Sequence, residues 1–160
     1  GTARRGYFVE GLGGAQFAIP GAVERLRDLR DAPPDEGHHA IVLGAADPAQ
    51  PYGAAVSWPP RDGATRSPSR VFGAQVVLVD GAPVLYLERG GRSLLTFPAD
   101  DRPGALERAL GALAAWVTAD RRRRVSVQRV DGEQVFGSPL ERPLADAGFL
   151  ADLRGMILRG

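Results

Sequence analysis

The 160-residue chain contains neither cysteine nor lysine. Without cysteine, it can form no disulfide framework and no thiolate metal site. Without lysine, it cannot complete a Walker A phosphate-binding loop, so this chain by itself is not a P-loop ATPase. It also has no apolar run long enough to cross a bilayer and no recognisable signal peptide. We therefore expect a cytoplasmic bacterial protein with no membrane partner.

Every basic residue is consequently an arginine. The 20 basic and 19 acidic residues leave a net charge of +1, so no global field attracts polyanions. One explanation of the missing lysine is a GC-rich genome, because arginine codons are GC-rich and lysine codons are not. The other is phosphate binding, for which the planar guanidinium is suited through two parallel hydrogen bonds. Composition alone does not separate the two explanations.

The 44% hydrophobic content, with 21 Gly and 13 Pro, indicates a real core built from many short elements. The clearest β element is a meander over residues 73–97, in which Asp80–Gly81 and Gly90–Gly91 separate three apolar runs. Shorter strands are predicted at residues 4–10, 39–43, 125–130, 134–136 and 155–158.

Apolar residues at helical spacing predict two amphipathic helices. Leu106, Leu110, Leu113 and Val117 share one face of a helix over residues 103–119, and a similar pattern predicts a helix over residues 19–30. A third, shorter helix is expected to end at Gly148. The predicted fold class is α+β, with a short-stranded curved sheet or β-barrel and two to three packed helices.

The glycine-rich segment at residues 6–17 does not match a dinucleotide-binding loop. Gly11 and Gly13 fit the fingerprint, but Gln16 stands where its third glycine is required. The predicted helix begins only near Pro20, so its N-terminus does not lie on the loop. A structural corner is the better interpretation.

Few other residues indicate catalysis or metal binding. His38 and His39 are adjacent on a predicted strand, so they point to opposite faces and cannot hold one metal ion together. Glu88, Asp131 and Glu133 lie near predicted strand ends and could act as acids or bases, although most surface carboxylates are only solvated. We predict no metal and no cofactor in this chain, and its catalytic residues, if any, stay unknown.

Two groups of arginines are candidates for contact with DNA phosphates. In the segment Glu88-Arg89-Gly90-Gly91-Arg92, the glycine pair lets the backbone approach a partner, and Arg89 and Arg92 can clasp a phosphate from either side. The second group lies at or just beyond the end of the helix predicted over residues 103–119, and consists of Arg121, Arg122, Arg123 and Arg124. This run could bind DNA, complement the helix dipole or form a solvated helix end.

Several segments, in order along the chain, resemble the C-terminal region of the bacterial large helicase-related (Lhr) family. They are RRGYFVEGLGGAQFAIPGAVERLR at residues 4–27, AADPAQPYGAAVSWP at 45–59, VVLVDGAPVLYLERGGRSLLTF at 76–97, and DAGF with RGMILR at 146–149 and 154–159. Each is moderately specific, and together they are spread along the chain from residue 4 to residue 159.

The resemblance implies a C-terminal accessory module of a superfamily 2, ATP-dependent 3′-to-5′ DNA helicase involved in DNA repair. The ATPase domains, with their ATP and magnesium, would lie upstream. The family's C-terminal region is an array of winged helices that ends in a β-barrel. Residues 1–30 would then supply the strand and helix that join a preceding winged helix, and residues 31–160 the barrel-like module. Gln16 and Phe17 would pack the glycine corner, with the Gln16 amide satisfying backbone groups.

Three roles follow from this resemblance. The first is DNA positioning, on single-stranded or forked DNA, through arginine–phosphate contacts and without chemistry of its own. The second is a share in a uracil-excising DNA glycosylase, since the family's C-terminal region is similar to one class of these enzymes. The third is an oligomerisation surface or structural cap that contacts another copy of the chain or the upstream winged-helix and helicase domains.

Overall fold

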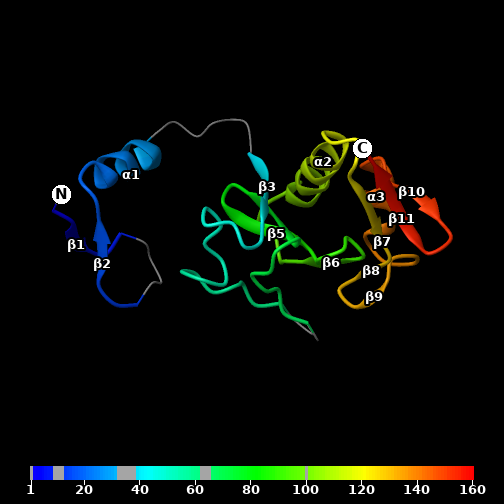
Figure 1. Cartoon of the computed structure of the whole chain (residues 1–160), viewed down its shortest axis with the longest axis horizontal. Helices are drawn as coiled ribbons and strands as arrows, with labels where there is room; N and C mark the ends of the chain where they lie inside the picture. Colours follow the sequence, from blue (N-terminus) through cyan, green and yellow to red (C-terminus); the bar gives the residue numbers. More distant parts are fainter. Residues whose placement is uncertain (1, 9–12, 32–38, 62–65, 100) are drawn as a thin grey trace. The chain divides into compact units, whose positions relative to one another are not determined.

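The computed structural model describes residues 2–8, 13–31, 39–61, 66–99 and 101–160. The chain divides into two compact units, Gly1–Gly37 and His38–Gly160, and each is described by itself. Figure 1 colours both units in chain order and labels most of their helices and strands. No helix in these described segments is long and apolar enough to cross a membrane.

The N-terminal unit consists of a β-hairpin followed by a helix. Strands β1 (Arg4–Gly6) and β2 (Gln16–Ala18) pair antiparallel, and helix α1 (Ala22–Asp31) follows them. The Gln16 side-chain oxygen accepts a hydrogen bond from the Phe8 backbone N–H at 2.7 Å, as predicted. Gln16 therefore ties the segment that follows β1 to strand β2.

Residues Gln16–Ala18 form strand β2, whereas the sequence predicts a loop there. The β1–β2 register places Phe17 directly opposite Arg5, so the two side chains share one face of the hairpin. Phe17 is 68% exposed instead of packed.

The larger sheet of the C-terminal unit contains the predicted meander. Its strand order is β3-β4-β5-β6-β8-β9, and all neighbours are antiparallel except the parallel pair β6–β8. The strands are β3 (Ala40–Gly44), β4 (Gln75–Val79), β5 (Ala82–Leu87), β6 (Ser93–Thr96), β8 (Arg129–Val130) and β9 (Glu133–Gln134). Asp80 and Gly81, both with positive φ (51° and 81°), form the tight turn between β4 and β5.

A second, three-stranded sheet has the order β10-β11-β7. Its strands are β7 (Arg124–Val127), β10 (Leu150–Asp152) and β11 (Gly155–Arg159). The single strand predicted at residues 125–130 is thus divided at Gln128, where the chain passes from one sheet to the other. The described strands form open sheets, so the curved-sheet prediction holds, whereas a closed barrel is not formed by them.

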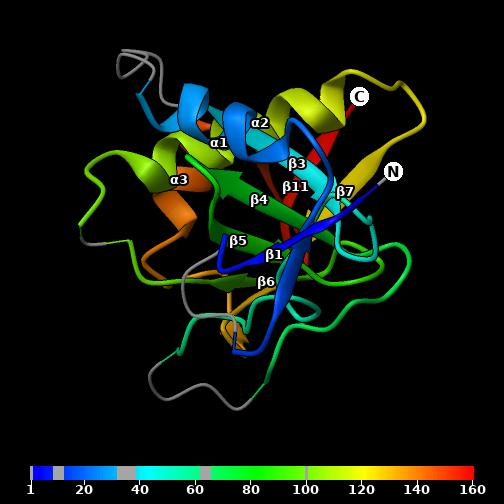
Figure 2. The ribbon, with the colours of Figure 1, turned by 90° about the vertical axis from the view of Figure 1, so that its left-hand side faces the viewer.

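Both faces of the larger sheet are buried. Helix α2 (Ala105–Thr118) lies against β3, β4 and β5 on one face (Figure 2), and the short helix α3 (Glu141–Asp146) contributes Leu144 to the same core. Val77, Val79 and Leu85 point into this core. The alternate residues of the same strands enter a second, smaller cluster, which includes Val76, Leu78, Tyr86, Leu95 and Phe97. This period of two is that of a sheet covered on both sides.

Candidate functional site

The turn at residues 88–92 is a tight, hydrogen-bonded hairpin. Gly90 and Gly91 have positive φ values of 90° and 69°, and the Gly91 N–H donates to the Glu88 carbonyl oxygen at 2.9 Å. The space around a Cβ built at Gly90 is open, as the predicted approach of a partner requires. Gly91 is buried, and a Cβ there would lie 3.6 Å from the Cα of Val125. Arg89 and Arg92 are both exposed.

Backbone hydrogen bonds attach this hairpin to strand β7. The Ser126 N–H donates to the Gly91 carbonyl at 3.1 Å, and the Gln128 N–H donates to the Arg92 carbonyl at 2.8 Å. Arg124, which is exposed at the start of β7, therefore lies close to the hairpin. The structure thus brings Arg124, one residue of the run 121–124, close to Arg89 and Arg92, although about thirty residues separate it from them in sequence.

Strand β11 adds an arginine that the sequence analysis misses. The β7–β11 register places Arg159 opposite Arg124, and both side chains are exposed. Like charges opposite one another destabilise a sheet, so fold stability does not explain this pair. We call Arg89, Arg92, Arg124 and Arg159 the arginine surface. In the described part of the chain, no side chain forms an ion pair or hydrogen bond with their guanidinium groups.

The remaining members of the run 121–124 differ from one another. The Arg123 guanidinium lies 4.3 Å from the centroid of the Trp116 ring, donates a hydrogen bond to the Trp116 carbonyl and forms an ion pair with Asp120 at 3.7 Å. Arg121 and Arg122 are exposed. Arg123 therefore stabilises the end of α2, while Arg121 and Arg122 face solvent.

The segment at residues 45–59 is held internally. The side chain of Gln50, 1% exposed, donates to the carbonyls of Ala45 and Tyr52 at 3.1 and 2.9 Å, and Arg70 donates to the Asp47 carbonyl at 3.0 Å. These bonds satisfy the polar groups of an irregular loop that covers the smaller core.

An aromatic stack continues from this loop into the sheet. The Trp58 ring stacks with those of Tyr52 and Phe97, with both centroid separations 5.8 Å and interplanar angles of 25° and 16°. Gly53 has φ 76°, and a Cβ there would lie 2.4 Å from the Trp58 Nε1. Burial raises the pKa of Tyr52, an effect that the charge of Arg102 partly offsets. Because Trp58 is half-buried and packs against Tyr52, Phe97 and Tyr86, it is poorly placed to stack on a nucleic-acid base.

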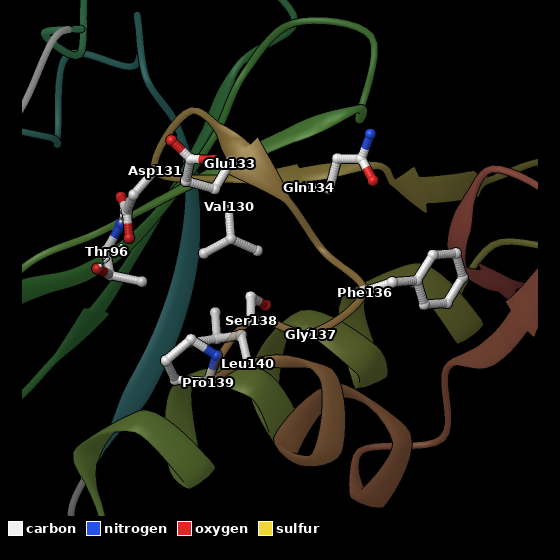
Figure 3. Close-up of a pocket in the computed structure, with 10 residues that line it drawn as sticks. All are labelled: Thr96, Val130, Asp131, Glu133, Gln134, Phe136, Gly137, Ser138, Pro139 and Leu140. Atoms are coloured by element: carbon white, nitrogen blue, oxygen red, sulfur yellow. Dashed lines mark hydrogen bonds between the residues drawn. The ribbon is translucent and has the colours of Figure 1, made fainter.

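A separate pocket of about 740 Å³ lies beside the β8–β9 hairpin (Figure 3). Its lining comes from Thr96, from the hairpin and from the loop that leads into α3. Figure 3 shows Thr96 and Asp131 together at one side of the pocket and Phe136 at the other. Val130 and Leu140 provide apolar lining, and the hairpin supplies carboxylate and amide groups, as a binding pocket requires.

The three candidate carboxylates have different surroundings. Asp131 accepts hydrogen bonds from the backbone N–H and the hydroxyl of Thr96, at 2.9 and 2.7 Å, and pairs with the guanidinium of Arg61. Glu88 forms an ion pair with Arg66 at 3.3 Å. Glu133 is exposed on β9 and lines the pocket. Asp131 therefore fixes the pocket wall, and Glu133 is the carboxylate better placed for a ligand.

Of the two histidines, only His39 lies within the described residues. His39 is exposed, and its backbone N–H donates to the Asp80 side chain at 3.0 Å, while His38 lies outside the described residues. Across the described ranges, no three His, Asp or Glu side chains come together as metal ligands.

Comparison with known proteins gives consistent matches. Residues 1–38 match a family model described as the winged-helix domain of the large helicase-related protein. A protein of Mycolicibacterium smegmatis named "Lhr helicase/ probable uracil glycosylase" is 46% identical over 168 aligned positions, covering 99% of this chain and 11% of that protein. An Escherichia coli protein named "Lhr helicase/uracil glycosylase" is 36% identical over 157 positions, covering 98% of this chain and 10% of that protein.

The chain thus spans about a tenth of the length of these curated relatives, and it matches their C-terminal part. The two alignments extend over both of its units, and the winged-helix match falls within the N-terminal unit and its border. On these matches, the chain belongs to the large helicase-related (Lhr) family and corresponds to the C-terminal part of its members.

Proposed function

We propose that this chain is an accessory module of an Lhr helicase that positions DNA through arginine–phosphate contacts at the arginine surface. The observation that carries the proposal is the attachment of the 88–92 hairpin to β7, which places Arg89 and Arg92 close to Arg124 and Arg159. The ATP-driven step, its magnesium ion and the role in DNA repair belong, in this proposal, to the longer protein. No cofactor is assigned to this chain.

The surface suits the DNA backbone because a guanidinium binds phosphate through two parallel hydrogen bonds. The net charge of +1 provides little long-range attraction, so local contacts must supply the affinity. Each phosphate contact with single-stranded DNA contributes a slope of about −0.7 to the dependence of log affinity on log salt concentration. Four contacts would give a slope of roughly −3.

The direct test is the double variant Arg89→Ala/Arg92→Ala, titrated against fluorescently labelled single-stranded DNA. We expect weaker binding and a salt slope that is smaller by roughly 1.4, because two phosphate contacts are lost. Arg142→Ala is a matched control, since Arg142 is exposed on α3 and is not part of the arginine surface. Unchanged affinity and slope in the double variant would refute the proposal.

We propose uracil excision as a second candidate function. Both relatives carry uracil glycosylase in their names, and the pocket in Figure 3 offers a space with an exposed carboxylate, Glu133, at its edge. A glycosylase needs such a pocket to hold the base that it turns out of the strand. Glu133→Gln in the full-length protein should reduce cleavage of a uracil-containing strand after alkali treatment while DNA binding persists. Unchanged excision would remove Glu133 from the proposal.

A structural role for the N-terminal unit is compatible with either activity. Helix α1 has no buried residue, and Ile19, Leu26 and Leu29 are 65%, 46% and 76% exposed. Because residues 1–38 match a winged-helix domain and the relatives are about ten times longer, we propose that the preceding part of that domain covers this apolar face. The hairpin and helix would then complete an upstream winged helix.

A further inference from the structure

Phe72 occupies the outer position of a rigid turn. The Ala74 N–H donates to the Val71 carbonyl at 3.3 Å, and Gly73 has φ 87°, as the third residue of such a turn requires. Ala74 is fully buried, and its carbonyl accepts the Ala45 N–H at 2.9 Å. The backbone is thus fixed on the inner side, while the Phe72 ring is 91% exposed. The ring contributes almost no burial to the fold.

A single exposed apolar side chain is common on protein surfaces and needs no explanation by itself. Phe72 differs because its turn contacts the arginine surface. A Cβ built at Gly73 would lie 3.3 Å from Cγ and 3.8 Å from Cδ of Arg89. The aliphatic part of Arg89 therefore lies against the residue next to Phe72. An exposed aromatic ring and a phosphate-binding candidate are neighbours on one surface.

An aromatic ring beside an arginine is the arrangement by which proteins hold single-stranded nucleic acid, with a base on the ring and the backbone at the cation. We propose that Phe72 stacks on a base of single-stranded DNA whose neighbouring phosphate is bound by Arg89. This inference rests on the proposed function and deepens it, because it defines the strand form that the arginine surface prefers. Duplex DNA presents only base edges in its grooves, so it offers no face to the ring.

Other aromatic side chains of the C-terminal unit fit this role less well. Trp58 is half-buried and stacks with Tyr52 and Phe97, and Phe136 is 40% exposed at the pocket beside the β8–β9 hairpin. A cavity of about 310 Å³ lies next to the Phe72 turn, lined by the 44–47 and 72–75 segments. The ring therefore borders a hollow of the surface as well as open solvent.

The test compares Phe72→Leu and Phe72→Tyr in the 160-residue chain. Leucine keeps an apolar side chain but removes the π face, whereas tyrosine keeps the ring. We expect Phe72→Leu to weaken binding of a labelled oligothymidine by roughly 5- to 150-fold, as loss of one stacked base implies, and Phe72→Tyr to bind like the parent. The melting temperature of both variants should match the parent, because the ring is exposed.

An abasic oligonucleotide of the same length separates stacking from charge, since it has the phosphates but no bases. The Phe72→Leu effect should disappear on this probe, while Arg89→Ala/Arg92→Ala should still weaken binding. If Phe72→Leu binds oligothymidine like the parent while the double arginine variant binds it weakly, the stacking inference is wrong and the arginine surface stands. If neither variant weakens binding of oligothymidine, the proposed function and this inference both fail.

Discussion

Helices α1 and α2 are both amphipathic, but α1 (AVERLRDLRD) is mostly charged and α2 (ALERALGALAAWVT) mostly apolar, and their surroundings differ. Helix α2 buries five residues, Ala105, Ala109, Leu110, Leu113 and Val117, against the larger sheet. Helix α1 buries none. The apolar period therefore predicts that a helix has an inner face, but not whether the same segment of chain supplies the partner for that face. In the N-terminal unit, the proposed partner lies in the preceding part of the longer protein.

The largest expected difference between the two helices is in the free energy of unfolding that is lost when a leucine is truncated to alanine. Leu113 is 0% exposed, so Leu113→Ala should lower the free energy of unfolding by about 2–5 kcal/mol. Leu29 is 76% exposed, and Leu29→Ala in the same chain should change it by less than about 0.5 kcal/mol. Urea unfolding followed by circular dichroism measures both. A cost above about 2 kcal/mol for Leu29→Ala would show that α1 is already packed, and would break the comparison.

The two units also differ in how closely other atoms pack around their glycines. A Cβ at Gly155 of β11 would lie 2.1 Å from the Val127 carbonyl oxygen, whereas a Cβ at Gly13 of the N-terminal unit meets no atom within 4 Å. Gly155→Ala should therefore cost about 1–3 kcal/mol by overpacking the β7–β11 pair. Gly13→Ala should be nearly neutral. Thermal unfolding of the two variants is the measurement, and equal melting temperatures would contradict the account.

Within the C-terminal unit, substitution of Arg123 should affect stability but not DNA binding, unlike substitution of the arginine surface. Arg123→Ala removes the contact with Trp116 and should cost about 1 kcal/mol of stability. Arg122→Ala leaves that contact intact and should change stability by less than about 0.5 kcal/mol. Arg123→Ala should leave the salt slope of DNA binding as it is, provided that the variant is folded. Anisotropy titrations beside unfolding curves test this division, and a reduced salt slope for Arg123→Ala would assign Arg123 to the DNA contact.

The smallest expected effect concerns alkaline pH. Burial raises the pKa of Tyr52 in the folded state, so the folded protein binds the phenolic proton more tightly than the unfolded chain. The resulting stability is fully present below the unfolded value of about 10 and is lost as the pH rises through the folded pKa. Tyr52→Phe should flatten the decline in melting temperature above this pH. An unchanged decline would show that Tyr52 does not cause it.

Local patterns explain which parts of the fold are predictable from sequence. The meander and the helix over residues 103–119 follow from apolar periodicity and turn residues, and the structure has both. Strands β2 and β10 have three residues each and no clear alternation, so they leave little signal. Closure into a barrel depends on long-range pairing, which periodicity does not encode.

The candidate site likewise combines features that have a local sequence signal with features that depend on long-range pairing. The glycine pair at residues 90–91 and the run 121–124 are visible as local motifs. Their proximity depends on backbone pairing between segments far apart in sequence, and so does the Arg124–Arg159 pair. The packing of Arg123 on Trp116 has a local signal, because the two residues are seven positions apart across a helix end. The Asp131–Arg61 ion pair joins residues 70 positions apart and has none.

The most direct test of the central claim is an anisotropy titration of the unmodified chain with single-stranded and forked DNA at two salt concentrations. The account predicts binding at low salt that weakens steeply as salt rises, because phosphate contacts release counterions. Absence of binding to either DNA at low salt would contradict it, and would leave the chain as a structural cap with DNA held elsewhere in the longer protein.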